Sequence, residues 1–186
     1  MALKNILNKS APPDEPEWWV VEEGLGGRTS CREDPIEGDK NGLRQLLPIL
    51  ESHKPIDLVV VMLGTNDLKL RFSPTPNDIA QGVKNVAIAI QKSDFGPGNA
   101  APKVLIICPP PVETLALQHI LGEDCVELSK KLPPLYKVRA NECGAAFLDA
   151  GKHIKSSLVD GVHLESEAQL LLAQAVAESV KSLFIA

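Results

Sequence analysis

Continuous apolar runs are the clearest pattern along the chain. Two longer runs lie at residues 56–63 and 103–108, and shorter ones lie at 3–7, 18–21 and 145–148. Within each run the apolar residues follow one another instead of alternating with polar ones, which is typical of parallel strands buried on both faces. We therefore expect a parallel sheet that is covered by helices on both sides.

Helical spacing fills the stretches between the apolar runs. It is clearest at residues 166–184, where Leu170, Ala173, Val176 and Val180 recur on one face of a helix. Other stretches with helical spacing lie at 43–51, 77–92, 114–120, 123–131 and 134–141. Strand and helix patterns that alternate in this way predict an α/β fold.

The connection between the first two apolar runs is unusual. It spans residues 8–17 and contains Pro12, Pro13 and Pro16, whereas a parallel crossover normally needs about a dozen residues and a helix. We expect the first crossover helix to be absent, which would leave one face of the sheet without its cover.

Two adjacent tryptophans follow this connection. Trp18 and Trp19 would point to opposite faces of a strand. One of them can enter the core, and the other would lie on the uncovered face or simply on the surface. Because large exposed apolar patches often mark interfaces, we expect the chain to form a homo-oligomer through this face.

Length and charge limit the classes of function. The 186 residues fit a single domain, 1–186, and the formal net charge of -5 makes nucleic acid or an anionic membrane surface a poor partner. Neither a signal peptide nor an apolar run long enough to span a bilayer is visible, so we expect a cytoplasmic protein without membrane association. The four cysteines lack CxxC spacing, which favours reduced thiols over a metal site or disulfides.

Polar residues follow the strongest apolar run in the order Leu63, Gly64, Thr65, Asn66 and Asp67. Loops at the carboxyl ends of parallel strands are where α/β folds bind ligands. The glycine permits a tight turn, and the amide of Asn66 can donate a hydrogen bond to a developing oxyanion. The same residues are also common in ordinary turns, so this motif alone leaves both interpretations open.

An aspartate precedes a histidine by three residues before the long C-terminal helix. Asp160 can reach the imidazole of His163, hold one tautomer and stabilise the imidazolium that forms when the histidine accepts a proton. A helix-capping loop with a surface histidine is the alternative. A third motif, the glycine-rich stretch 22–29, could present backbone N–H groups to an anion, although such loops are more often flexible turns.

Four segments in this order resemble the SGNH (GDSL) hydrolase family, and its arylesterase-like branch in particular. They read VVEEGLGGRTS, VVVMLGTNDLK, APKVLIICPPP and DGVHLESEA. The resemblance extends from about residue 18 to the C-terminus. It implies a three-layer α/β/α sandwich with a flavodoxin-like parallel sheet, strand order 2-1-3-4-5, in which residues 3–7 form the central strand.

The resemblance also implies roles for individual residues. His163 would be the general base and Asp160 its orienting partner, while the side chain of Asn66 and the backbone N–H of Gly27 would form the oxyanion hole. The activity implied is hydrolysis of small carboxylic (acyl or aryl) esters through an acyl-enzyme, with no metal or other cofactor.

The nucleophile segment departs from the family pattern. The family has Gly-Asp-Ser-Leu after its first strand, whereas this chain has Asn8-Lys9-Ser10-Ala11 after residues 3–7. Three interpretations remain open. Ser10 is a displaced nucleophile; or the nucleophile block is missing and the chain is a catalytically impaired binding or structural module; or another serine such as Ser30 substitutes. A nucleotide-binding domain is disfavoured because no phosphate-binding loop opens the first helix.

Overall fold

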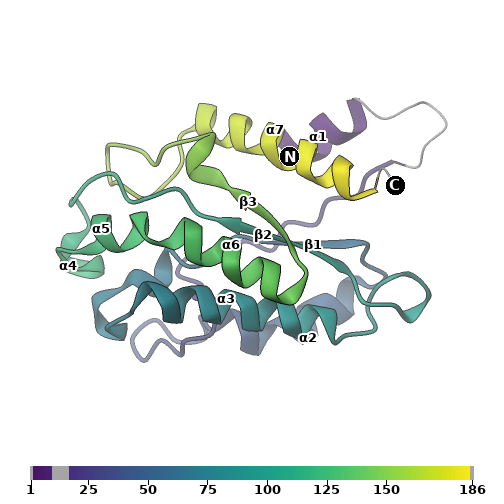
Figure 1. Cartoon of the computed structure of the whole chain (residues 1–186), viewed down its shortest axis with the longest axis horizontal. Coiled ribbons are helices and arrows are strands. Elements are labelled where there is room, and N and C mark those ends of the chain that lie inside the picture. The colour runs from purple at the N-terminus through teal and green to yellow at the C-terminus, as the bar shows by residue number, and fades with distance from the viewer. Residues whose placement is uncertain (1, 10–16, 185–186) are drawn as a thin grey trace.

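A three-stranded parallel sheet forms the centre of the computed structural model, which describes residues 2–9 and 17–184. Its strands are β1 (Leu58–Val61), β2 (Lys103–Cys108) and β3 (Ala146–Asp149), in the order β1-β2-β3. All three strands run in the same direction, so their carboxyl ends meet at one edge of the sheet (Figure 1).

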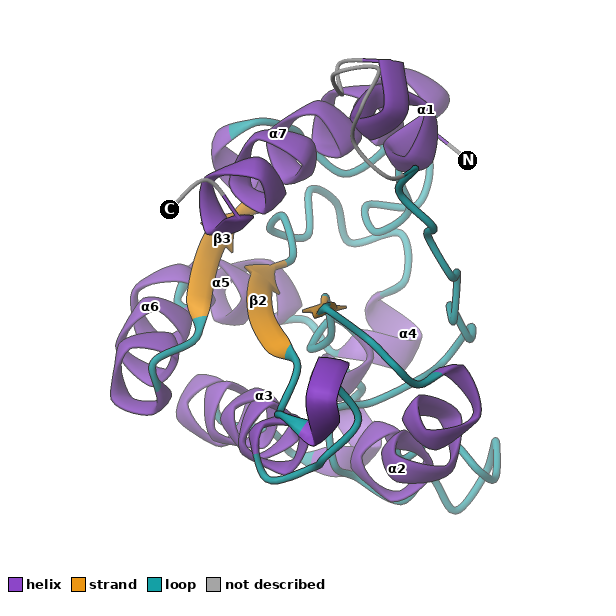
Figure 2. Cartoon of the chain, turned by 90° about the vertical axis from the view of Figure 1, so that its right-hand side faces the viewer, coloured by secondary structure: helices purple, strands orange, loops and turns teal. Residues whose placement is uncertain are grey.

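Helices cover both faces of this sheet, as expected of a three-layer α/β/α sandwich (Figure 2). The helices are α1 (Ala2–Lys9), α2 (Gly42–His53), α3 (Pro76–Gln91), α4 (Gln118–Leu121), α5 (Cys125–Lys130), α6 (Leu132–Cys143) and α7 (Ser166–Phe184). Six of them correspond to the helices predicted from residue 43 onward, and the predicted range of the last one is confirmed at both ends.

Alternation along β2 divides the core into two clusters. Val104, Ile106 and Cys108 face a cluster that includes side chains from α2, α3 and α6. Leu105 and Ile107 face a second cluster that includes side chains from α1 and α7. Each fully buried aliphatic side chain of this kind stabilises the fold by about 1.5–3 kcal/mol relative to an exposed one.

The expected strand at residues 3–7 is wrong, because these residues belong to helix α1. Leu3, Ile6 and Leu7 recur at the i, i+3, i+4 spacing of a helix, and all three pack in the second cluster, where Leu7 is 2% exposed. Helix α1 lies beside α7 and helps to cover the sheet face that we expected to be bare (Figure 1). Residues 10–16 of the proline-rich connection lie outside the described residues.

The expected strand at residues 18–21 is also wrong, since no strand pairing of these residues occurs in the described part of the chain. The segment is nevertheless extended and alternates, with Trp18 and Val20 in the second cluster and Trp19 and Val21 exposed. The side chain of Asn8 accepts from the N–H of Trp18 at 2.7 Å and donates to its carbonyl at 3.2 Å. This side chain therefore satisfies backbone groups that a neighbouring strand would otherwise pair.

The two errors change the sheet that we predicted. The described strands correspond to the third, fourth and fifth in the predicted order 2-1-3-4-5, and β1 is an edge strand of the described sheet. Val60 on this strand and Met62 just after it are 38% and 41% exposed, whereas β2 between its two neighbours is buried along nearly its whole length.

Tyr136 on α6 fixes the chain just beyond β1. Its side chain is 1% exposed, and its hydroxyl donates to the carbonyl of Leu63 at 2.8 Å. Gly64, which follows, has a φ of 121°, and a Cβ at this position would lie 2.0 Å from the tyrosine oxygen. Only glycine allows the turn and the tyrosine to occupy this space together.

Replacing Tyr136 by phenylalanine should lower the free energy of unfolding by roughly 1–3 kcal/mol, because the carbonyl of Leu63 loses its buried donor while the ring volume is kept. Urea unfolding followed by circular dichroism measures this change. The control is Ser52→Ala, which removes an exposed hydroxyl bond to Ile49 and should change stability by less than about 0.5 kcal/mol. Equal effects of the two substitutions would contradict the role given to Tyr136.

Candidate active site

The turn that carries Asn66 follows β1 directly. Residues Asn66–Leu68 form a short 3-10 helix, and the N–H of Asp67 donates to the carbonyl of Gly64 at 3.2 Å. Asn66 is half-buried, whereas Asp67 and Leu68 are buried. The turn is therefore anchored on the core side, and it lies at the carboxyl edge of the sheet, where the sequence placed it.

The loop that carries Gly27 is bound to this turn. Gly27 has a φ of 81° in a turn closed by the N–H of Arg28, which donates to Leu25 at 3.2 Å. Three residues later, Ser30 donates its N–H and its hydroxyl to the two carboxylate oxygens of Asp67, at 2.8 and 2.6 Å. The glycine-rich loop and the asparagine turn are thus joined by a buried contact.

An ion-pair network joins the same two segments further along the chain. Lys69, which is 4% exposed, and Arg71 both bind the carboxylates of Asp34 and Glu37. Burial by itself would raise the pKa of Asp34, but hydrogen bonds from backbone N–H groups, Arg71 and Lys69 together hold it well below its usual range. Lys69 is therefore not a solvated surface charge but a member of a buried ion-pair network.

The Asp160–His163 pair has the geometry expected from its spacing. One carboxylate oxygen of Asp160 accepts from the N–H groups of Val162 and His163 at 2.8 and 2.9 Å, and the other lies 2.7 Å from Nδ1 of the His163 ring. The hydrogen bonds from the two backbone N–H groups and from the ring lower the pKa of Asp160 to about 2. The carboxylate is therefore ionised at neutral pH and holds the imidazole by one nitrogen.

The ring of His163 is open to solvent. Its side chain is 78% exposed, whereas that of Asp160 is 29% exposed. With Nδ1 directed at Asp160, Nε2 is left to act on a bound molecule. A capping loop alone would not require this pairing of the ring with the carboxylate.

The loop that carries Asp160 and His163 is attached to the loop that follows β2. Glu113 donates its N–H to the carbonyl of Gly161 at 2.9 Å, and a Cβ on Gly161 would lie 2.6–2.7 Å from atoms of Thr114. Ser156 also donates to the carbonyl of Pro111 at 3.0 Å. Since the loops after β1, β2 and β3 all leave the carboxyl edge, the turn of Asn66 and the loop of His163 lie at the same edge of the sheet.

The remaining serines have different environments. Ser30, considered as a substitute nucleophile, is 0% exposed and bonded to Asp67, so a substrate cannot reach its hydroxyl. Ser10 lies outside the described residues. Among the described residues, no serine hydroxyl is hydrogen-bonded to His163; that of Ser157 donates to Glu165 instead.

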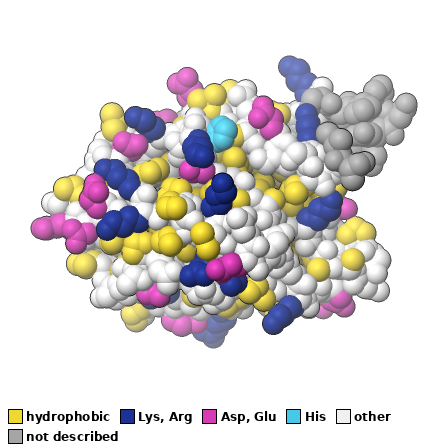
Figure 3. Space-filling model, viewed as in Figure 1, with side chains coloured by type: hydrophobic (Ala, Val, Ile, Leu, Met, Phe, Trp, Pro, Cys, Tyr) yellow, Lys and Arg dark blue, Asp and Glu magenta, His cyan; other side chains and the backbone are white. Residues whose placement is uncertain are grey.

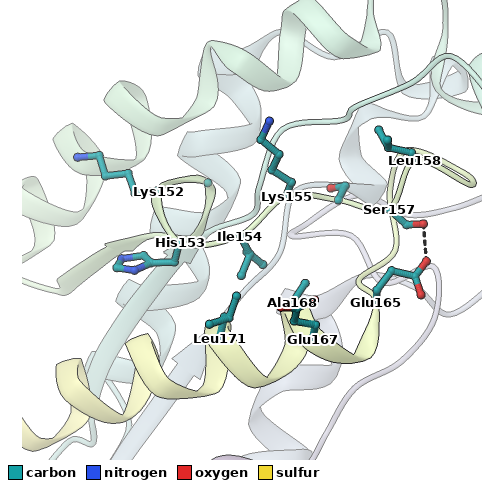
Figure 4. A pocket seen from close by; sticks show the side chains of 12 residues that line it. Lys152, His153, Ile154, Lys155, Ser157, Leu158, Glu165, Glu167, Ala168 and Leu171 are labelled. Carbon is teal, nitrogen blue, oxygen red and sulfur yellow. Dashed lines mark hydrogen bonds between the residues drawn. The ribbon is translucent and has the colours of Figure 1, made fainter.

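A shallow pocket of about 460 Å³ lies between the segment that follows β3 and the start of α7 (Figure 4). It is lined by residues after β3 and at the start of α7, among them Lys152, Lys155, Glu165 and Glu167. Figure 4 shows the two lysines extending in different directions, while Glu165 is bonded to Ser157. The mixed charges favour no particular ligand, and the lining contains neither Asn66 nor His163.

Charge is distributed without a dominant sign on the face seen in Figure 3, where basic and acidic side chains are interspersed. Within residues 2–9 and 17–184, no group of histidine, cysteine or acidic residues is arranged to hold a metal ion. All four cysteines are free. No helix of the described chain has the length and apolar character needed to cross a membrane.

Two contacts that fix the turn after β1 were not foreseen from the sequence. Asp67 was read only as a favourable turn residue, and Tyr136 was not singled out, although it is the only tyrosine of the chain. Their partners, Ser30 and the carbonyl of Leu63, are 37 and 73 residues away. The only signal in the sequence for the contact of Tyr136 with Leu63 was that the chain contains a single tyrosine.

Comparisons with known proteins agree with this architecture. A carbohydrate acetylesterase from Sinorhizobium meliloti is 35% identical, with a TM-score of 0.88 over 98% of this chain and 84% of the other. The aryl esterase of M. smegmatis gives the same identity and TM-score over 98% and 83%. A putative arylesterase from Agrobacterium tumefaciens is 36% identical, with a TM-score of 0.83 over 97% and 84%.

The search among curated proteins gives no match. The model of the GDSL-like lipase/acylhydrolase family matches residues 5–170, which is most of the chain. The resemblance drawn from the four sequence segments is confirmed by this match and by the likeness to the three structures. The chain belongs to the GDSL-like lipase/acylhydrolase family.

Proposed function

We propose that the chain hydrolyses small carboxylic esters at the carboxyl edge of its sheet. His163 acts as the general base, Asp160 orients it, and Asn66 and Gly27 supply the oxyanion hole. The observation that carries this proposal is the pairing of Asp160 with Nδ1 of His163 at 2.7 Å, which leaves the exposed ring free to exchange protons with a substrate.

The mechanism uses only side chains and backbone groups. His163 takes the proton of a hydroxyl nucleophile as that oxygen attacks the ester carbonyl, and Asp160 stabilises the resulting imidazolium. The amide of Asn66 and the N–H of Gly27 donate to the oxyanion of the tetrahedral intermediate. The imidazolium then protonates the leaving alcohol, and water activated by His163 releases the acid from the acyl-enzyme.

The similar structures guide the proposed substrate class. They are those of a carbohydrate acetylesterase, an aryl esterase and a putative arylesterase. We extend to this chain the feature that these substrates share, a small acyl group on an alcohol or phenol. An exposed base that sits on a loop and not in a deep cavity is compatible with such short acyl chains.

The nucleophile of this mechanism is a serine hydroxyl, and the proposed residue is Ser10. Ser10 was expected to follow a central strand, but residues 2–9 form a helix. Ser10 is proposed because it is the serine nearest in sequence to the place of the family motif.

The second candidate is a catalytically impaired member of the family that binds ligands without turning them over. It is favoured by one observation: in the described part of the chain, the ring of His163 contacts Asp160 and no serine hydroxyl.

We further propose a cytoplasmic homo-oligomer. Self-association is supported by Trp19, whose side chain is 80% exposed, with the ammonium of Lys4 over its ring at 4.8 Å. Trp18 instead enters the second cluster, where its ring meets Phe184 edge-on at 5.4 Å.

Replacing His163 by alanine should lower kcat/KM for a chromogenic short-chain ester by about 10³-fold or more, because the base is lost. The matched control is His53→Ala. His53 is also paired with a carboxylate, that of Glu23 at 2.7 Å, but it lies outside the proposed site and its loss should leave the rate unchanged. Equal rates for the wild type and His163→Ala would reject the proposed base.

Labelling with a fluorophosphonate, followed by mass spectrometry, should locate the nucleophile. An adduct on Ser10, together with loss of activity in Ser10→Ala, supports the acyl-enzyme mechanism with this serine. An adduct on another serine moves the nucleophile to that residue. Absence of both an adduct and ester turnover in the wild type would support the second candidate.

The carboxyl carbon of Asp160 should titrate with a midpoint near pH 2 in carbon-detected NMR, because three hydrogen bonds hold its pKa there. Since its pKa in the folded chain lies below the ordinary value of 3.8, the stability that the ionised carboxylate contributes is complete above about pH 4 and is lost as the pH falls through 2. A midpoint close to 4 would show that the loop is not closed on His163.

Sedimentation velocity at micromolar concentration should show a species larger than the monomer, and Trp19→Ala should shift it toward the monomer. Ile36→Ala is the control, because Ile36 is 73% exposed on a different loop. A wild type that sediments as a monomer would remove the support for self-association through Trp19.

A further inference from the structure

A buried carboxylate lies next to the proposed oxyanion donor. Asp67 follows Asn66 in the chain, and its side chain is 0% exposed. Each of its two oxygens accepts one hydrogen bond from Ser30, from the hydroxyl at 2.6 Å and from the N–H at 2.8 Å. Such charge-assisted bonds are shorter and stronger than bonds between neutral groups.

Both ends of this contact are anchored. The carbonyl of Ser30 accepts from the N–H of Leu43, in the first turn of α2, at 2.9 Å. A Cβ on Gly82 of α3 would lie 2.3 Å from the Ser30 hydroxyl oxygen, so the helix approaches the serine as closely as glycine permits. On the other side, the turn of Asp67 continues directly from β1 through Gly64. The contact therefore connects two helices with the end of a strand.

The two proposed oxyanion donors lie close in sequence to the two ends of this contact. Asn66 is the residue before Asp67, and Gly27 lies three residues before Ser30. Oxyanion stabilisation depends on donors that are already in position, to within about 0.5 Å, before charge develops. The buried carboxylate of Asp67 would by itself repel an oxyanion bound nearby. The positive charge of Arg32, whose Nε is 3.9 Å from Asp67, offsets this repulsion.

We propose that Asp67 and Ser30 are positioning residues that set the distance between the oxyanion donors Asn66 and Gly27. They do not touch the substrate. Their contact joins the two segments that carry the donors and keeps the donors in place when the substrate is absent. This inference rests on the proposed function, because it concerns the donors of that same site.

The test compares three variants for ester hydrolysis. Asp67→Ala should lower kcat by about 10²-fold, the loss typical of one displaced oxyanion donor, while KM stays nearly constant because the donors act mainly in the transition state. Asp67→Asn should recover much of this loss, because its carbonyl can still accept from the Ser30 N–H and its amide can donate to the hydroxyl. If Asp67→Ala does not fold, Ser30→Ala replaces it with the same expected direction.

Asp34→Asn is the matched control, since Asp34 is a buried carboxylate on the same loop that binds Lys69 and Arg71 instead of Ser30. It should lower the melting temperature and leave kcat within a small factor of the wild type. Equal losses of kcat in Asp34→Asn and Asp67→Ala would mean that general loop stability is responsible, and this would overturn the positioning role.

Hydrogen exchange at the amides of residues 27–30 gives a readout that does not depend on catalysis. The Ser30 amide should be protected in the wild type and in Asp34→Asn, and exposed in Asp67→Ala. If the wild type hydrolyses ester and Asp67→Ala loses protection without losing kcat, the positioning role is wrong and the proposed function stands. If the wild type hydrolyses no ester, the proposed function fails and the positioning role for catalysis fails with it, whereas the exchange data still show whether Asp67 holds the loop.

Discussion

The common direction of β1, β2 and β3 is the constraint on which the site depends. Because the strands are parallel, the chain leaves all three at the same edge, and it must cross back over a face of the sheet before each new strand begins. Asn66 comes directly after the first strand, and His163 comes within the connection that follows the third. Asn66 and His163 are nearly one hundred residues apart in the sequence. The parallel strands therefore bring both to one edge of the sheet, and no direct contact between the two residues is needed.

Polar contacts between loops then fix the positions of the segments that the parallel strands bring close together. Ser30 is hydrogen-bonded to Asp67, and Gly161 is hydrogen-bonded to Glu113 and lies close against Thr114. The apolar core supports these loops, since Val112 is buried in the first cluster and Val162 packs against that cluster. The proposed donors and base are thus carried on loops that are hydrogen-bonded to neighbouring segments, which reduces the reorganisation that a substrate must induce.

The sequence correctly predicts the parts of this structure that depend on a long apolar pattern or on residues close together in the chain. Residues 103–108 form a strand and 166–184 a helix as predicted, and the pairing of Asp160 with His163 follows from a spacing of three residues. The run at 3–7 is too short to distinguish strand from helix by its apolar content, and the expectation of a central strand outweighed its i, i+3, i+4 spacing. The partners of Asp67 and Tyr136 depend on how distant segments pack, which no local pattern contains.

If the asparagine turn and the histidine loop serve one ligand, both must respond to the same bound molecule. Ethyl methylphosphonate is a tetrahedral anion that resembles the ester-hydrolysis intermediate, and its binding can be followed by NMR at two signals. We expect the side-chain amide of Asn66 and the ring of His163 to shift together, with a single Kd. Shifts of only one of them, or two different affinities, would contradict it.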